Sequence, residues 1–451
     1  MVAEDVLALI GNTPLVRLNH VTKGMRAKVY AKLEYSNPGG SVKDRIGLSM
    51  ILEAEKKGLL KKGYTIVEPT SGNTGMGLAL AAVLRGYSII FTVPDKMSRD
   101  KIDILRAVGA KVRVTPSKVP PDHPQSYVQV AKKIARETPH SFMPNQYENL
   151  ANPGAHYSTT GPEIWEQTGG RIDVLVAGVG TGGTISGTGR YLKERKPSLR
   201  VVGADPVGSI LTDTFRGGKG RAKPYRIEGI GEDFIPKTLN LGVIDEFVPV
   251  TDKQAFGMAR RLAKEEGLLA GGSSGAAAYV ALKVAKNLGP SATVVVILPD
   301  TGRNYINRIY NDDWMAEHGY LKRGGKRIPV NAVLKSIAVS RPKLEPADSV
   351  LKAVGALEAT NFPCLPVEED GVQVGSVSGT SLVRNLLEGR ISHKTKIKGL
   401  MESPMPAVEA GSLLLDPASI LSERGAFVVA RGAKVVGVIA TVDVIRYLAR
   451  R

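Results

Sequence analysis

The chain has 451 residues, of which 43% are hydrophobic and 23% charged, and its formal net charge is +18 at pH 7. This length predicts two or three globular domains. No apolar run approaches the roughly 20 residues of a membrane helix, and the N-terminus lacks a secretory pattern, so we expect a cytoplasmic protein that binds no membrane.

A single cysteine, Cys364, excludes an internal disulfide, and the six histidines show no ligand spacing, so no metal site is expected. The basic segments are dispersed and are not interleaved with aromatic residues. This favours a solvated basic surface over a nucleic-acid site.

Strand-like apolar runs alternate with amphipathic segments from about residue 28 to 300. The expected strands are residues 28–35, 65–70, 87–95, 110–117, 172–180, 200–206 and 293–300. Residues 42–57 show the period of a helix that ends at Gly58. The alternation predicts an α/β fold with mostly parallel sheets, in which ligands bind beyond the carboxyl ends of the strands.

The pattern changes near residue 320. Residues 321–336 are basic and rich in glycine at their start, which predicts a linker. Beyond it, residues 372–387 and 433–448 share one layout, two strand-like stretches followed by a helix. We therefore expect a catalytic domain over 1–320 and an internal repeat over 337–451, with units at about 337–390 and 397–451.

The loop "PTSGNTG" at 69–75 follows an expected strand and opens a helix. Free backbone amides there, together with the side chains of Thr70, Ser71, Asn73 and Thr74, form a neutral cradle for a carboxylate. A tight turn with a capping side chain explains the same loop equally well.

A second loop, "GVGTGGT" at 178–184, brings glycine amides to a helix start, as in phosphate sites. It also spells G-x-G-x-x-G, and Asp205 follows near the distance of a ribose-binding acid, so a dehydrogenase is a rival interpretation. No lysine follows the glycines, which excludes a Walker-type loop.

Lys43 lies at the start of the helix over 42–57, where a cation is mildly disfavoured. A surface lysine is the common explanation for such a residue. Pyridoxal phosphate fits the combination of a lysine, a phosphate loop, a carboxylate cradle and "GGSSG" at 271–275. Its aldehyde condenses with a lysine amine. Ser273 at the ring nitrogen would leave the ring a milder electron sink than a carboxylate would, which suits β-replacement.

Five motifs follow one another along the chain: "GNTPLVRL", "NPGGSVKDR", "EPTSGNTG", "VGTGGT" and "GGSSG". With these motifs in this order, the chain resembles the cysteine synthase and cystathionine β-synthase family of fold type II pyridoxal-phosphate enzymes, which are tryptophan synthase β-like. The stretches "HYSTTGPEIW", "IEGIGEDFIP" and "ILPDTGRNYI" are similar to the cystathionine β-synthase branch. The C-terminal repeat resembles a tandem CBS-domain pair. The resemblance covers nearly all of residues 5–320 and the repeat.

The resemblance implies a role for each residue that matches a family motif. Lys43 would bind the cofactor aldehyde and act as the catalytic base; Gly180, Thr181, Gly182, Gly183 and Thr184 would hold the phosphate; Asn73 would bond the ring hydroxyl and Ser273 the ring nitrogen. Thr70, Ser71, Thr74 and Gln146 would hold the substrate carboxylate, while Tyr147 and the loop 228–234, including Gly229 and Glu232, would border the second-substrate site.

The implied reaction is a transsulfuration step in which L-serine and L-homocysteine give cystathionine and water. Release of hydrogen sulfide from cysteine plus homocysteine is expected as well. Cysteine synthesis from O-acetylserine and sulfide is the alternative on the same fold. A nucleotide sensor or basic binding protein with a vestigial enzyme domain is the interpretation from another class, and the intact loops disfavour it. The family implies a homodimer or homotetramer.

Three positions depart from the family pattern. No cysteine precedes Cys364, so we expect no haem, and Glu232 stands where animal members have tyrosine. CBS domains that bind adenosyl ligands pair a hydroxyl with an acid; the first repeat keeps only the hydroxyl, Ser378, and the second keeps Asp443 with Thr441 displaced by one place. Binding of S-adenosylmethionine and a packing or dimerisation role both remain open.

Overall fold

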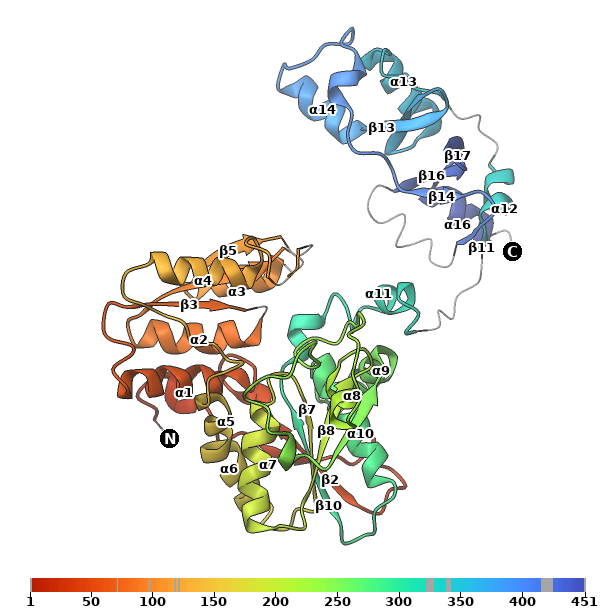
Figure 1. The fold of residues 1–451 in the computed structure, drawn as a ribbon. Helices are drawn as coiled ribbons and strands as arrows, with labels where there is room; N and C mark the ends of the chain where they lie inside the picture. Colours follow the sequence, from red (N-terminus) through yellow and green to blue (C-terminus); the bar gives the residue numbers. More distant parts are fainter. Residues whose placement is uncertain are drawn as a thin grey trace. The chain divides into compact units, whose positions relative to one another are not determined.

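The computed structural model describes residues 2–70, 72–95, 97, 99–116, 119–120, 122–321, 328–337, 342–414 and 425–449. The chain divides into two compact units, residues 1–320 and 321–451, which are drawn in Figure 1. Across the described residues, no helix has the length and apolar character needed to span a membrane.

The larger sheet of the first unit has six strands. Their order is β1 (Leu15–Arg17), β2 (Lys28–Leu33), β10 (Thr293–Leu298), β7 (Val174–Gly178), β8 (Arg200–Pro206) and β9 (Glu246–Val250). All neighbours run parallel except β1 and β2. Every residue of β10 is buried, as expected for an inner strand covered on both faces.

Helices cover both faces of this sheet (Figure 1). α9 (Asp252–Glu266) and α10 (Gly272–Ala285) contribute Phe256 and a row of alanines to the core on one face. α6 (Gly161–Gln167) and α7 (Gly183–Arg195) contribute Ile164, Ile185 and Leu192 to the core on the other.

The smaller sheet is entirely parallel, in the order β5 (Lys111–Thr115), β4 (Ser88–Pro94), β3 (Thr65–Pro69) and β6 (Ser141–Phe142). α1 (Lys43–Lys56), α2 (Asn73–Leu84) and α3 (Arg99–Ala107) share one core with it, while α4 (Tyr127–Glu137) contacts β3 and β4. α1 and α2 touch at Gly47 and Gly77, where a Cβ on Gly77 would lie 2.4 Å from the carbonyl oxygen of Lys43. Because these glycines have no side chain, the two helices can approach closely near their starts.

Short segments complete the first unit. They are the 3₁₀ turns Val6–Leu9, Glu34–Ser36, Leu241–Val243 and Gly302–Tyr305, the π-turn His156–Thr160, and the helices α5 (Ala151–Ala155), α8 (Leu211–Phe215) and α11 (Asp312–Glu317). The predicted α/β fold with mostly parallel sheets is confirmed. β1, β6 and β9 were not expected, because β1 has three residues, β6 has two, and β9 carries Pro249 in a short run.

The second unit has a five-stranded sheet in the order β12 (Cys364–Glu369), β13 (Val372–Ser378), β17 (Lys434–Ala440), β16 (Ala426–Arg431) and β14 (Ala407–Glu409). The hairpin of β12 and β13 leads into α14 (Gly379–Leu387), and that of β16 and β17 into α16 (Thr441–Ala449). α13 (Val350–Thr360) precedes the first hairpin, and the 3₁₀ turn Ile397–Leu400 follows it.

The linker prediction for 321–336 is wrong over 328–335. These residues form β11 (Ile328–Pro329), which pairs with β15 (Leu413–Leu414), and α12 (Val330–Lys335). Val330 and Val333 are fully buried in the core of the second repeat beside Phe427. A helix this short is stable only through such packing, so its sequence gave little periodic signal.

Candidate active site

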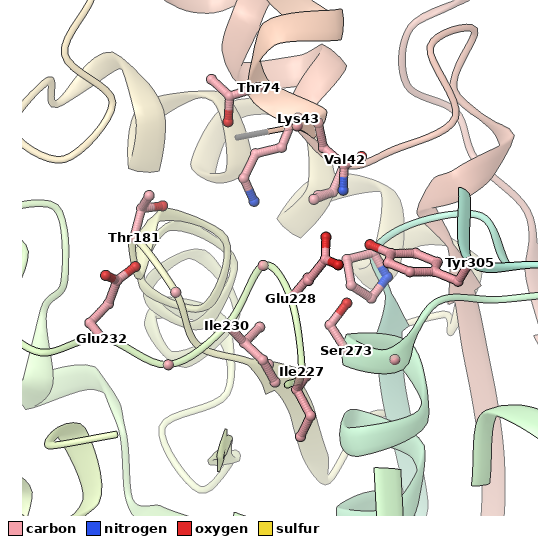
Figure 2. Close-up of a pocket in the computed structure, with 18 of the residues that line it drawn as sticks. Val42, Lys43, Thr74, Thr181, Ile227, Glu228, Ile230, Glu232, Ser273 and Tyr305 are labelled. Atoms are coloured by element: carbon pink, nitrogen blue, oxygen red, sulfur yellow. The ribbon is translucent and has the colours of Figure 1, made fainter. Parts of the chain in front are cut away.

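A cavity of about 690 Å³ lies between the two sheets of the first unit. Its walls come mainly from loops that follow the carboxyl ends of β2, β3, β7 and β10, where parallel sheets place their ligands. Figure 2 shows Lys43 and Thr74 on one wall and Thr181, Ser273 and Glu232 across from them.

Four helices begin at this cavity, and none has a side-chain cap. They are α1, α2, α7 and α10, whose cap positions are Val42, Gly72, Gly182 and Gly271. The long helices α4 and α9 are instead capped by Ser126 and Thr251. Uncapped amides and the helix dipoles make the cavity favourable for anionic groups.

Lys43 is the first residue of α1, and its amine is directed into the cavity (Figure 2). Desolvation lowers the pKa of Lys43, against the opposing charges of Asp300 and Glu232. Among the described residues, the hydrogen bond found for Lys43 outside the helix ladder is that of its backbone amide to Ser41 Oγ at 3.2 Å. A desolvated amine of lowered pKa loses its proton more readily than an exposed lysine, which makes it a better nucleophile and proton acceptor.

The loop before α7 is built for close approach of the backbone. Gly182 has φ +80°, and a Cβ there would lie 2.5 Å from the Cβ of Leu239; a Cβ on Gly180 would lie 2.7 Å from the carbonyl oxygen of Gly229. A Cβ on Gly183 would lie 1.8 Å from Asn152 Oδ1. These glycines expose amides that a side chain would otherwise cover.

Neutral side chains support this loop. Asn152 donates to the hydroxyl of Thr181 at 3.1 Å, and Thr184 lies 3.2 Å from His156 Nε2. The pKa of His156 is lowered well below its usual range, first by burial and then by Arg45 and Lys43, so the imidazole is neutral. Asn152 and His156 were not predicted, because neither belongs to the loop's own motif.

Asp300 joins three groups of the site and was also missed. It follows β10, is 1% exposed, and accepts hydrogen bonds from Asn73 at 2.9 Å, Tyr305 at 2.7 Å and Ser273 at 3.4 Å. Burial raises the pKa of Asp300. The signal in the sequence was its place in "ILPDTGRNYI", two residues after the end of β10.

The predicted carboxylate cradle is assembled from two separate segments. Thr70, Thr74 and Gln146 are buried and line the cavity, while Ser71 lies outside the described residues. The hydroxyl of Thr74 donates to Gln146 Oε1 at 2.7 Å. This bond leaves the amide Nε2 of Gln146 as the donor for a substrate oxygen.

The mouth of the cavity carries the predicted loop 228–234. Gly229 has φ +83°, and the ring of Tyr147 lies 5.2 Å from that of Phe234. Glu228 pairs with both Lys101 and Arg308, two cavity residues that the sequence did not suggest.

Glu232 lines the cavity within the same loop. Burial, and secondly the charge of Asp233, raise the pKa of Glu232 to about 8, against the opposing effect of Lys43. The side chain is therefore largely protonated at neutral pH.

Asp205 does not lie where a ribose-binding acid of a dinucleotide site would lie. It is fully buried, does not line the cavity, and accepts hydrogen bonds from the backbone and hydroxyl of Thr212. Burial raises its pKa. The carboxylate therefore fixes the start of α8.

The three predicted regulatory residues take part in local bonds of the second unit. Ser378 caps α14 and donates to Glu402 at 2.7 Å, Thr441 donates to the carbonyl of Gly425 at 3.1 Å, and Asp443 accepts from the amide of Ala440 at 2.9 Å.

The residues of the cavity fit pyridoxal phosphate. The glycine amides before α7 suit its phosphate, the Lys43 amine its aldehyde, and Asn73 and Ser273 the polar edge of its ring. Within the described ranges, no cluster of His, Cys, Asp or Glu could hold a metal ion.

Residues 6–300 match the family model described as "Pyridoxal-phosphate dependent enzyme". The chain belongs to this family. It is 39% identical to "Cystathionine beta-synthase" of Dictyostelium discoideum, over 99% of this chain and 93% of that protein. It is 50% identical to "Cystathionine beta-synthase" of Apis mellifera, over 71% of this chain but only 64% of the length of the honeybee protein.

A solved structure is also similar to this pyridoxal-phosphate-dependent enzyme. It is the "O-acetylserine dependent cystathionine beta-synthase from Helicobacter pylori", with a TM-score of 0.64 and 42% identity. The match covers 69% of this chain and 100% of the other.

Proposed function

We propose that this enzyme condenses L-serine with L-homocysteine to form cystathionine and water. One observation carries the proposal: a desolvated lysine amine faces a glycine-amide cradle for phosphate and a Thr74–Gln146 cradle for an α-carboxylate within one cavity. The cystathionine β-synthases similar to the chain support the choice of reaction.

Each group then has one task. Pyridoxal phosphate, when bound, supplies an electron sink for charge at the α-carbon of an amino acid. Lys43 takes the proton from the α-carbon, and its lowered pKa favours this at neutral pH. Thr74 and Gln146 hold the α-carboxylate, and Ser273 would be a neutral partner for the ring nitrogen, which suits β-replacement.

The leaving group separates the two candidate reactions. Serine loses a hydroxyl, whereas O-acetylserine loses the better leaving group acetate, and the Helicobacter pylori enzyme is named as O-acetylserine dependent. Release of hydrogen sulfide from cysteine plus homocysteine belongs to the same proposal, because a thiol can leave from the same carbon.

A side-by-side assay decides between the first substrates. We expect turnover with L-serine and L-homocysteine to exceed turnover with O-acetylserine and sulfide at equal concentrations. Cystathionine and cysteine are measured by mass spectrometry in parallel reactions. Faster formation of cysteine from O-acetylserine and sulfide would replace this proposal by cysteine synthesis.

Glu232 gives a prediction on pH dependence. Its pKa in the folded protein, about 8, lies above its value in an unfolded chain, so burial of the ionised carboxyl costs stability as the pH rises through 8. A Glu232→Gln variant should therefore gain stability relative to the wild type between about pH 6 and pH 9. Urea denaturation at both pH values measures the difference; a constant difference would contradict the prediction.

Four further statements are proposals that rest on the sequence alone. They are the absence of haem, assembly as a homodimer or homotetramer, a cytoplasmic location, and CBS repeats at about 337–390 and 397–451 that bind S-adenosylmethionine or serve in packing. Enzyme rates and melting temperatures with and without S-adenosylmethionine address the last of these.

A further inference from the structure

Glu68 is a buried carboxyl for which the proposed reaction has no use. It lies on β3, two residues before Thr70, and is 1% exposed. Among the described residues it has no cationic partner, and burial raises the pKa of Glu68 to about 7. An acid buried without a counter-charge is costly, which points to a purpose other than stability.

The carboxyl holds the backbone of one turn. Glu68 Oε2 accepts the amide of Asn145 at 2.9 Å, and Oε1 accepts the amide of Gln146 at 3.3 Å. Asn145 has φ +51°, in the left-handed region, which asparagine enters more readily than most residues other than glycine. The two hydrogen bonds stabilise this turn.

This turn also determines where the side chain of Gln146 lies in the cavity. Its second residue, Gln146, is the one whose side chain accepts the hydroxyl of Thr74 at 2.7 Å. Glu68 joins β3 to the loop after β6, and the Thr74–Gln146 bond joins the start of α2 to the same loop. The position of the Gln146 amide therefore depends on both links.

We propose that Glu68 is a positioning residue that sets the shape of the substrate-carboxylate cradle through the turn at Asn145 and Gln146. The proposal rests on one part of the proposed function, namely that the first substrate is an amino acid with a free α-carboxylate. L-Serine and O-acetylserine both meet this condition, so the choice between them does not affect it.

The test uses the full-length, cofactor-loaded protein with Glu68→Gln and Glu68→Asp. In Glu68→Gln, one acceptor becomes an NH₂ donor that faces a backbone donor. We expect the KM for the first substrate to rise about tenfold, while kcat stays within about twofold and the visible absorbance of the bound cofactor is retained. Glu68→Asp keeps two acceptors and should show a smaller rise in KM.

A direct readout of the turn accompanies the kinetics. Hydrogen–deuterium exchange at the amides of Asn145 and Gln146 should be faster in Glu68→Gln than in the wild type. A control away from the cavity is Asp173→Asn, because Asp173 accepts the amide of Thr293 at 2.7 Å and pairs with Lys196 at the opposite ends of the strands. This variant should lower the melting temperature and leave KM unchanged.

The possible outcomes separate the two proposals. Unchanged KM in both Glu68 variants, or a loss of cofactor equal to the loss of turnover, would overturn the positioning role. Should Glu68→Gln fail to fold, Glu68→Asp carries the same comparison. Wild-type protein that turns over neither L-serine nor O-acetylserine would instead defeat the proposed function.

Discussion

A Lys43→Ala protein is expected to be colourless after purification and to turn over at least about 10³-fold more slowly than the wild type. The physical reason is twofold. The amine of Lys43 is the group of the cavity placed to condense with the cofactor aldehyde, and it is also the base for the α-proton. Absorbance spectra of equal protein concentrations, before and after borohydride reduction, measure the first effect.

The control is Lys57→Ala at the C-terminal cap of the same helix. The side chain of Lys57 is 60% exposed and pairs with Glu53 on the helix surface. This variant should keep both the colour and the activity, since an exposed pair of this kind contributes little. A Lys43→Ala protein that keeps its visible absorbance would show that another lysine binds the cofactor.

A Gly182→Ala protein should lose cofactor binding and be less stable by about 3 kcal/mol. Two costs combine at this position. The backbone has φ +80°, which alanine adopts only with strain, and the new Cβ would lie 2.5 Å from the Cβ and 2.7 Å from the Cα of Leu239. The loop must move to relieve the contact, and its amides then no longer converge on the phosphate.

Gly63→Ala separates the cost of backbone strain from the cost of a steric contact. Gly63 has φ +86°, but nothing lies within 4 Å of its Cβ position. This variant should lose only about 1 kcal/mol and bind the cofactor normally. Urea denaturation gives the stabilities and titration of the apoprotein with pyridoxal phosphate gives the affinities; equal affinities of Gly182→Ala and wild type would contradict the assigned cradle.

Much of the site was predictable because its chemistry lies in local sequence. Each loop after a buried parallel strand opens a helix, and small residues are required where the backbone must approach a ligand. Lys43 and the glycines 180, 182 and 183 could therefore be identified from the motifs that contain them. The α/β fold followed from the alternation of strand and helix patterns.

Contacts between distant segments were not predictable. Asp300 receives bonds from Asn73, 227 residues away, and Glu68 holds a turn 77 residues away. Both acids stand in quoted motifs, Glu68 in "EPTSGNTG" and Asp300 in "ILPDTGRNYI", but a motif does not show which distant segments its carboxyl contacts.

The sequence by itself therefore determined the parallel α/β architecture, the lysine and the loops that fit pyridoxal phosphate, because these depend on local periodicity and on small residues at strand ends. Only the tertiary structure decided which carboxyls support those loops, that Lys43 is desolvated, and that residues 328–335 pack into the second repeat. Burial and charge pairing depend on chain segments that meet only after folding.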